Sequence, residues 1–146
     1  MNEQAEKAVR QMIGALPHSV ALGMEVTAVK PGEVELSMGY APHLVGDPAT
    51  GVIHGGAVSA LMDTCGGAAV MSHPDAGIGT ATLDLRIEYM RAATPGQAMK
   101  ARATCYHVTR SVAFVRAVAM DEDEANPVAS ATGTFTVPGK KLGKKT

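Results

Sequence analysis

The sequence predicts an α+β domain in which an antiparallel sheet packs against one long helix. No proline interrupts residues 55–72, and apolar residues recur there at helical spacing: Val58, Leu61, Met62, Cys65 and Ala69. Much of the remaining chain alternates apolar and polar residues with period two, which is typical of strands with one buried face. Because such segments lie on both sides of the single long helix, we expect that helix to cover one face of the sheet.

The predicted helix carries a second stripe, made of very small side chains around one carboxylate, Asp63. Its members are Gly56, Ser59, Ala60, Asp63, Gly66, Gly67 and Val70. A glycine inside a helix costs about 1 kcal/mol relative to alanine, so we expect another element to lie tightly against Gly66 and Gly67. At the start of the helix, Gly55 and Gly56 leave the amides of the first turn open to a ligand oxygen atom.

The other elements follow from the same two periodicities and from turn residues. A short amphipathic helix is expected from Glu3 to Leu16, where Pro17 ends the pattern. Six strands are expected, at residues 23–30, 33–40, 78–90, 97–109, 111–120 and 128–137. The acidic run 121–124 is interpreted as a solvated turn.

Within the predicted strand 78–90, strict alternation assigns a face to each side chain. Leu83, Leu85 and Ile87 fall on one face, and Thr82 falls on the opposite face.

Length and composition fit one globular domain over residues 1–146, with 46% hydrophobic and 18% charged residues. Residues 1–17 hold the short helix, and residues 138–146 are expected to be a basic, flexible tail. The net charge of −1 argues against a nucleic-acid partner. No apolar run reaches the roughly 18 residues of a membrane span, and the N-terminus lacks a signal-peptide pattern, so we expect a cytoplasmic protein.

The two cysteines, Cys65 and Cys105, are expected to be reduced thiols in the core, because the chain has no Cys-x-x-Cys motif and no His/Cys cluster. We therefore predict neither a disulfide nor a metal site.

Two motifs carry a resemblance to a known family. The first is Gly51-x-x-His54-Gly55-Gly56 with Asp63 nine positions after the histidine, and the second is the segment Leu83-Asp84-Leu85-Arg86-Ile87-Glu88-Tyr89-Met90-Arg91. With these motifs, residues 15–137 resemble the PaaI-like branch of the hotdog-fold acyl-CoA thioesterases. The resemblance implies a sheet wrapped around the central helix, a homodimer or a dimer of dimers whose sheets join edge to edge, and no metal or redox cofactor.

The resemblance also implies roles for four individual residues. Asp63 matches the carboxylate that acts as nucleophile or general base, and Gly55 matches the amide that polarises the thioester carbonyl. Thr82 matches the residue that orients the nucleophile or water. His54 matches the motif histidine, which has a supporting or thioester-positioning role in the family, although such a histidine is equally often structural.

The family resemblance further suggests which residues contact the substrate. Gly56 belongs to the glycine pair of the motif, and Arg91 and the pair Arg110-Ser111 match positions that bind the pantetheine and phosphate part of CoA, for which a guanidinium is suited. Many relatives carry an asparagine six or seven residues before the histidine, where this chain has Asp47 and Pro48. Because an ionised carboxylate donates no hydrogen bond, Asp47 is a secondary candidate.

The predicted function is hydrolysis of an acyl-CoA thioester to the free acid and CoA. Gly55 and Asp63 are eight helical residues apart, about 12 Å along the axis, so one active site is expected to combine groups from two subunits. Two alternatives remain open. One is a hotdog hydratase or dehydratase acting on acyl thioesters, and the other is a non-catalytic acyl-CoA-binding protein.

Overall fold

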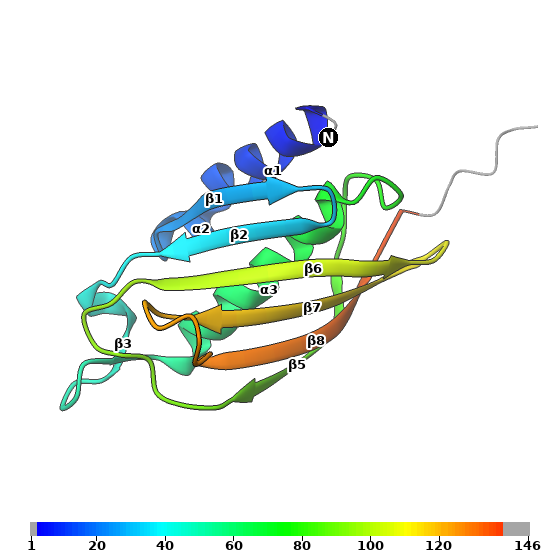
Figure 1. Ribbon diagram of the computed structural model, residues 1–146. Coiled ribbons are helices and arrows are strands. Elements are labelled where there is room, and N and C mark those ends of the chain that lie inside the picture. Colours follow the sequence, from blue (N-terminus) through cyan, green and yellow to red (C-terminus); the bar gives the residue numbers. More distant parts are fainter. Residues whose placement is uncertain (1–2, 139–146) are drawn as a thin grey trace, which may run out of the picture.

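The computed structural model describes residues 3–138 and consists of an antiparallel six-stranded sheet with one long helix across its face (Figure 1). The helices are α1 (Glu3–Ala15), α2 (Pro17–Ala21) and α3 (Gly55–Ser72), with a short 3-10 turn, η1, at Pro42–Leu44. The strands of the sheet, in spatial order, are β1 (Met24–Lys30), β2 (Glu33–Met38), β6 (Met99–Val108), β7 (Val112–Met120), β8 (Ala129–Thr136) and β5 (Thr82–Tyr89). The predicted α+β arrangement is confirmed.

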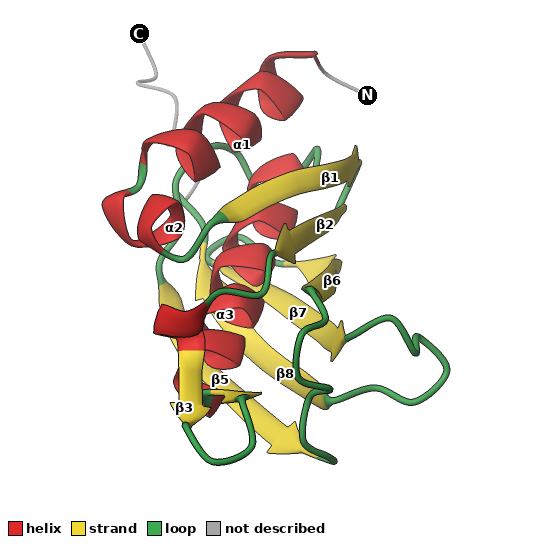
Figure 2. Cartoon of the chain, turned by 90° about the vertical axis from the view of Figure 1, so that its left-hand side faces the viewer, coloured by secondary structure: helices red, strands yellow, loops and turns green. Residues whose placement is uncertain are grey.

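Helix α3 forms the centre of the core, and the curved sheet passes around one side of it (Figure 2). All five residues of the predicted apolar stripe are buried: Val58, Leu61, Met62, Cys65 and Ala69. Burial raises the pKa of the Cys65 thiol to about 12, so this thiol stays protonated at neutral pH. The predicted close approach is also confirmed, since a Cβ atom at Gly66 would lie 2.8 Å from Cζ of Phe135 on β8.

The N-terminal segment contains two helices where the sequence predicted one. Val9 and Ile13 of α1 are buried in the core cluster, as the amphipathic pattern predicted. Pro17 ends that pattern but also begins α2, because proline has no N–H to satisfy and its φ is already suited to the first position of a helix. The prediction missed α2, and with it the position of His18.

Between η1 and α3 the chain forms a small unpredicted sheet. Its two strands are β3 (Val45–Asp47) and β4 (Val52–Ile53), which pair antiparallel. The 48–51 loop between them folds back on Asp47, whose backbone oxygen accepts hydrogen bonds from the amides of Thr50 at 3.2 Å and Gly51 at 2.8 Å. The second strand of this hairpin ends two residues before the start of α3.

Strand β5 differs from its prediction in two respects. It begins at Thr82 rather than near residue 78, because Gly79 adopts a φ of 116° that ordinary strand residues avoid. A bulge between Thr82 and Asp84 also shifts the register against β8, so strict alternation fails there. Thr82 therefore faces α3 together with Leu85 and Ile87, and its predicted placement on the opposite face is wrong.

The interpretation of residues 121–124 as a solvated turn is wrong for Asp121, which is only 2% exposed. Its burial is explained by an ion pair with Arg91. The predicted basic tail lies outside the described residues apart from Pro138. Among residues 3–138, no helix is long and apolar enough to cross a membrane.

Candidate active site

The first turn of α3 presents one unused backbone donor. The side chain of His54 caps the helix, since its Nδ1 accepts a hydrogen bond from the Gly56 amide at 2.8 Å. The Gly55 amide, in contrast, has no acceptor among residues 3–138. Of the two motif glycines, Gly55 is thus the one whose N–H is available to an external oxygen atom, and the positive end of the helix dipole favours negative charge there.

A pocket of about 320 Å³ lies beside Gly55. Helix α3, strand β4 and the segment following β5 supply most of its lining: Val52, Ile53, Gly55, Val58, Tyr89, Met90, Arg91, Ala92, Ala93 and Val128. Most of these side chains are apolar, so an oxygen atom that enters the pocket meets few competing hydrogen-bond donors.

The carboxylate of Asp63 is in direct contact with the hydroxyl of Thr82. Thr82 Oγ1 on β5 donates a hydrogen bond of 2.6 Å to Asp63 Oδ1. The half-buried Asp63 and the exposed Thr82 border a second pocket of about 420 Å³. Its lining is His18, Ser59, Ala60, Asp63, Thr64, Thr82, Leu85 and Ile87. The bulge in β5 is what brings the Thr82 hydroxyl to the carboxylate.

The two pockets share no lining residue. Along α3 the residues Gly55 and Asp63 are separated by about 12 Å, at 1.5 Å of rise per residue. Within one chain, therefore, the free amide and the carboxylate open onto different parts of the surface.

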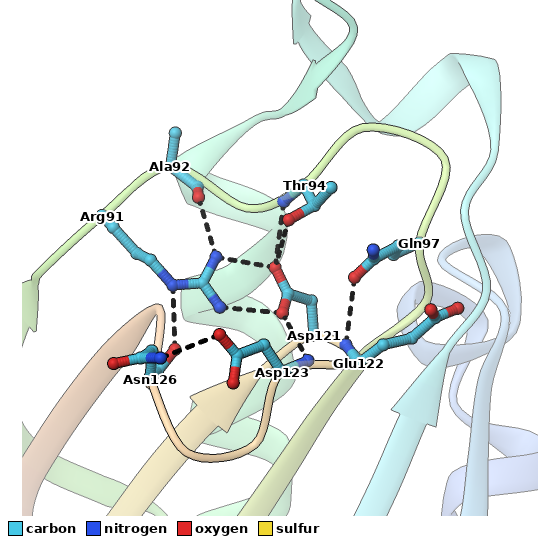
Figure 3. Close-up of polar contacts among 8 residues, drawn as sticks. All are labelled: Arg91, Ala92, Thr94, Gln97, Asp121, Glu122, Asp123 and Asn126. Carbon is cyan, nitrogen blue, oxygen red and sulfur yellow. Dashed lines mark hydrogen bonds and ion pairs between the residues drawn. The ribbon is translucent and has the colours of Figure 1, made fainter.

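Arg91 is held by a polar cluster within the chain (Figure 3). Its two terminal nitrogens donate to Asp121 Oδ1 and Oδ2, each at 2.7 Å, and its Nε donates to the Asn126 carbonyl at 2.8 Å. The side chain of Asp121 is fully buried, and the Thr94 amide and hydroxyl also bond to it, at 3.0 and 2.9 Å. With most of its donors used, Arg91 has a structural role, and its predicted contact with CoA stays a prediction.

The Arg91 guanidinium holds the pKa of the Asp121 carboxyl well below its usual range. A carboxyl whose pKa is lowered by folding adds stability above its unfolded pKa of about 4, and this contribution is lost as the pH falls. We expect Asp121→Ala to lower the free energy of unfolding by about 2 kcal/mol at neutral pH, and the difference from wild type to shrink below pH 4. Thermal melts across pH check this.

Glu122→Ala is the matched control, because it removes an exposed carboxylate from the next position. It should change the free energy of unfolding by no more than about 0.5 kcal/mol. Equal changes in the free energy of unfolding for the two substitutions would show that the buried ion pair adds no more stability than an exposed carboxylate.

The structure does not bring the other predicted substrate residues to either pocket. Arg110 and Ser111 lie exposed at the turn between β6 and β7, and Arg110 borders a separate hollow with Asp75 and Pro138. Asp47 is exposed in its hairpin, where Oδ1 accepts from the Ala49 amide at 3.0 Å and Oδ2 from the Thr50 hydroxyl at 2.8 Å. The geometry gives Asp47 a loop-stabilising role, and its role in binding stays a prediction.

The pocket residues that the sequence did not assign to a site include His18, Ser59 and Tyr89. Ser59 was recognised only as a small member of the stripe, and Tyr89 only as a strand residue of the second motif. The helical spacing of four between Ser59 and Asp63 was the one available signal, because it puts both on the same face. Nothing in the sequence placed His18, since α2 was not predicted.

A family model described as the thioesterase superfamily matches residues 50–128, which include both α3 and β5. The chain belongs to the thioesterase superfamily. A crystal structure of a Pseudomonas aeruginosa protein is 35% identical, covers 92% of this chain and 99% of its own, and superposes with a TM-score of 0.82. The match confirms the predicted hotdog fold.

Two further relatives carry functional names. A mutant of PaaI from Thermus thermophilus, described as a phenylacetic acid degradation protein, is 28% identical, covers 84% of this chain and 99% of its own, and has a TM-score of 0.73. The medium/long-chain acyl-CoA thioesterase YigI of Escherichia coli K12 is 29% identical over 92% of this chain and 95% of YigI. This thioesterase-superfamily member is thus PaaI-like and a thioester hydrolase, as predicted.

Proposed function

We propose that this thioesterase hydrolyses acyl-CoA to the free acid and CoA, with Asp63 activating the attack and the Gly55 amide binding the oxyanion. The hydrogen bond from Thr82 to Asp63 carries the proposal, because it fixes one oxygen of a carboxylate that borders a pocket. The similarity to YigI, an acyl-CoA thioesterase, supports the substrate class.

The chemistry requires one base and one oxyanion donor. As general base, Asp63 takes a proton from water while the water oxygen attacks the thioester carbon. The carbonyl oxygen gains negative charge and accepts a hydrogen bond from Gly55 N–H. The C–S bond then breaks, the thiolate leaves with the electron pair, and the proton held by Asp63 is returned to solvent or to the thiolate. Asp63 acting as nucleophile would instead form an anhydride that water opens.

We further propose that each site combines Gly55 of one subunit with Asp63 of another. Two separate pockets in one chain support this arrangement, and β5, which holds Thr82 and Tyr89, is an edge strand of the sheet. Leu83 and Met90 expose 56% and 53% of their surface at this edge. An apolar edge strand is a ready surface for pairing with a second copy, as a dimer or within a dimer of dimers.

Release of free thiol from acyl-CoA substrates tests the function directly. Hydrolysis liberates one thiol for each acyl group, whereas hydration of the acyl chain or simple binding liberates none. Because His18 and Asp63 line the same pocket, hydratase activity is an alternative that this readout must exclude. Ala60, Leu85 and Ile87 give the Asp63 pocket apolar walls, so aliphatic chains should be accepted. No thiol release from short, medium, long or aryl acyl-CoA would refute the proposal.

Loss of the Thr82 hydroxyl is expected to lower the rate of turnover without abolishing it. Thr82→Val keeps the size and β-branching but removes the hydroxyl, so kcat should fall about tenfold, which corresponds to about 1.4 kcal/mol of transition-state stabilisation. Because Thr82 is exposed, the melting temperature should change little. Steady-state kinetics and a thermal melt check both parts, and a loss as large as that of Asp63→Asn would reassign the roles.

A further inference from the structure

The carbonyl of Gly55 is bound by two hydroxyl groups in addition to the helix backbone. Tyr89 Oη lies 2.8 Å from Gly55 O, and Ser59 Oγ lies 3.1 Å from the same atom. The two hydroxyls also contact each other. Two hydroxyl protons cannot serve all three contacts at once. Either both hydroxyls donate to the carbonyl, or one donates to the other, which donates to the carbonyl.

These contacts connect the first turn of α3 to strand β5. Tyr89 is the last residue of β5, where it pairs with Ala129 of β8 and is therefore fixed by the sheet. Its ring also lies beside Gly55, since a Cβ atom placed there would be 3.6 Å from Tyr89 Cε1. Strand β5 thus holds α3 at two polar points, Tyr89 at the helix start and Thr82 at Asp63.

A fixed first turn matters because an oxyanion donor works only when it is aimed in advance. Helix ends fray, and two consecutive glycines, Gly55 and Gly56, make this end more flexible than most. The His54 cap holds the Gly56 amide, but no contact among residues 3–138 holds the Gly55 amide. The hydroxyl pair on the Gly55 carbonyl restrains this residue from the side of β5, in addition to the His54 cap, which holds the N–H of the same peptide unit.

We propose that Tyr89 and Ser59 are positioning residues that keep the Gly55 amide aimed at the substrate carbonyl. The inference rests on the proposed oxyanion role of Gly55. Tyr89 is 49% exposed, and substitutions at exposed positions usually change stability little, so a purely structural role would leave turnover nearly unchanged. A positioning role instead affects kcat more than KM, because the oxyanion exists only in the transition state.

Tyr89→Phe tests the proposal, because it removes the hydroxyl and keeps the ring that lines the pocket. We expect kcat for acyl-CoA to fall about tenfold, with KM within about twofold and the melting temperature nearly unchanged. Tyr106→Phe is the matched control. That tyrosine is 47% exposed on β6, its ring lies 4.3 Å from the Arg116 guanidinium, and it borders neither pocket, so its loss should leave kcat unchanged.

Ser59→Ala should lower kcat in the same direction, and combining it with Tyr89→Phe should cost less than the two separate losses together, because both act on one carbonyl. Two results would overturn the proposal: an unchanged kcat in Tyr89→Phe, whether or not KM rises, or an equal loss in Tyr106→Phe. A higher KM would mean that the hydroxyl binds substrate in the ground state.

An NMR measurement separates this proposal from the proposed function. The Gly55 amide cross-peak should shift in Tyr89→Phe and stay in place in Tyr106→Phe, whether or not the enzyme acts on any particular acyl-CoA. If the wild type releases no thiol while the cross-peak shifts, the proposed function fails and the contact stands. An unmoved Gly55 cross-peak refutes the positioning role on its own.

Discussion

Asp63→Asn is expected to lower kcat by at least about 100-fold, the lower range for loss of a general base. Asparagine keeps the shape and the oxygen that accepts from Thr82, but it cannot take a proton from water or attack the thioester at a useful rate. KM should change little, since the missing interaction belongs to the transition state. Thiol release under steady-state conditions gives both constants.

The fold should tolerate this substitution. Asp63 is half-buried at a pocket, and its hydrogen bond to Thr82 involves an exposed partner, so the change in the free energy of unfolding should stay within about 1 kcal/mol. Asp84→Asn is the matched control on the same strand as Thr82, because its carboxylate accepts from the Thr134 amide at 3.0 Å and borders neither pocket. Near-normal turnover by Asp63→Asn would refute the catalytic assignment.

Elements with a strong local pattern could be predicted from the sequence. The boundaries of α3 followed from its helical periodicity and from the glycines at its start, and the burial of its apolar stripe followed from the same pattern. The β1–β2 hairpin could be predicted equally well, since Pro31 and Gly32 occupy the turn between two alternating segments. In these cases local propensity and tertiary packing agree.

Other features depend on partners that are distant in the sequence. The bulge that turns Thr82 toward Asp63 arises in the pairing of β5 with β8, about 50 residues later in the chain, so no local pattern reports it. Asp121 looked solvated because its neighbours are charged, yet its partner Arg91 lies 30 positions earlier. The periodicity of a segment carries no information about such distant partners.

The candidate site also contains residues that the sequence indicates and residues whose contacts depend on distant partners. The family resemblance indicated Gly55, Asp63 and Thr82 together. The structure adds that His54 Nδ1 accepts from the Gly56 amide, which leaves Gly55 as the free donor. Tyr89 belongs to the second motif but had no predicted role, because a tyrosine at a strand end contacts a helix start only after the sheet has formed. His18, which borders the Asp63 pocket, was missed for a related reason, since its position depends on the unpredicted helix α2.

A mixture of Asp63→Ala and Gly55→Pro subunits is expected to recover activity that neither variant has alone. The structure makes Gly55→Pro a clean change: the lost N–H has no acceptor among residues 3–138, and proline is favoured at the first helical position. His54, with φ −58° and ψ 132°, already has the conformation that a residue before proline prefers. Each homodimer lacks one of the two groups at every site and should be inactive.

In a mixed dimer, one site joins the intact Gly55 of one subunit to the intact Asp63 of the other, and the second site has lost both groups. Random exchange of equal amounts makes about half of the dimers mixed, and one of their two sites works, so activity should reach about a quarter of wild type. Light scattering must first show that both variants dimerise, and labelled subunits must show that they exchange. If both groups came from the same chain, every site would lack one of them, and exchanged subunits would remain inactive.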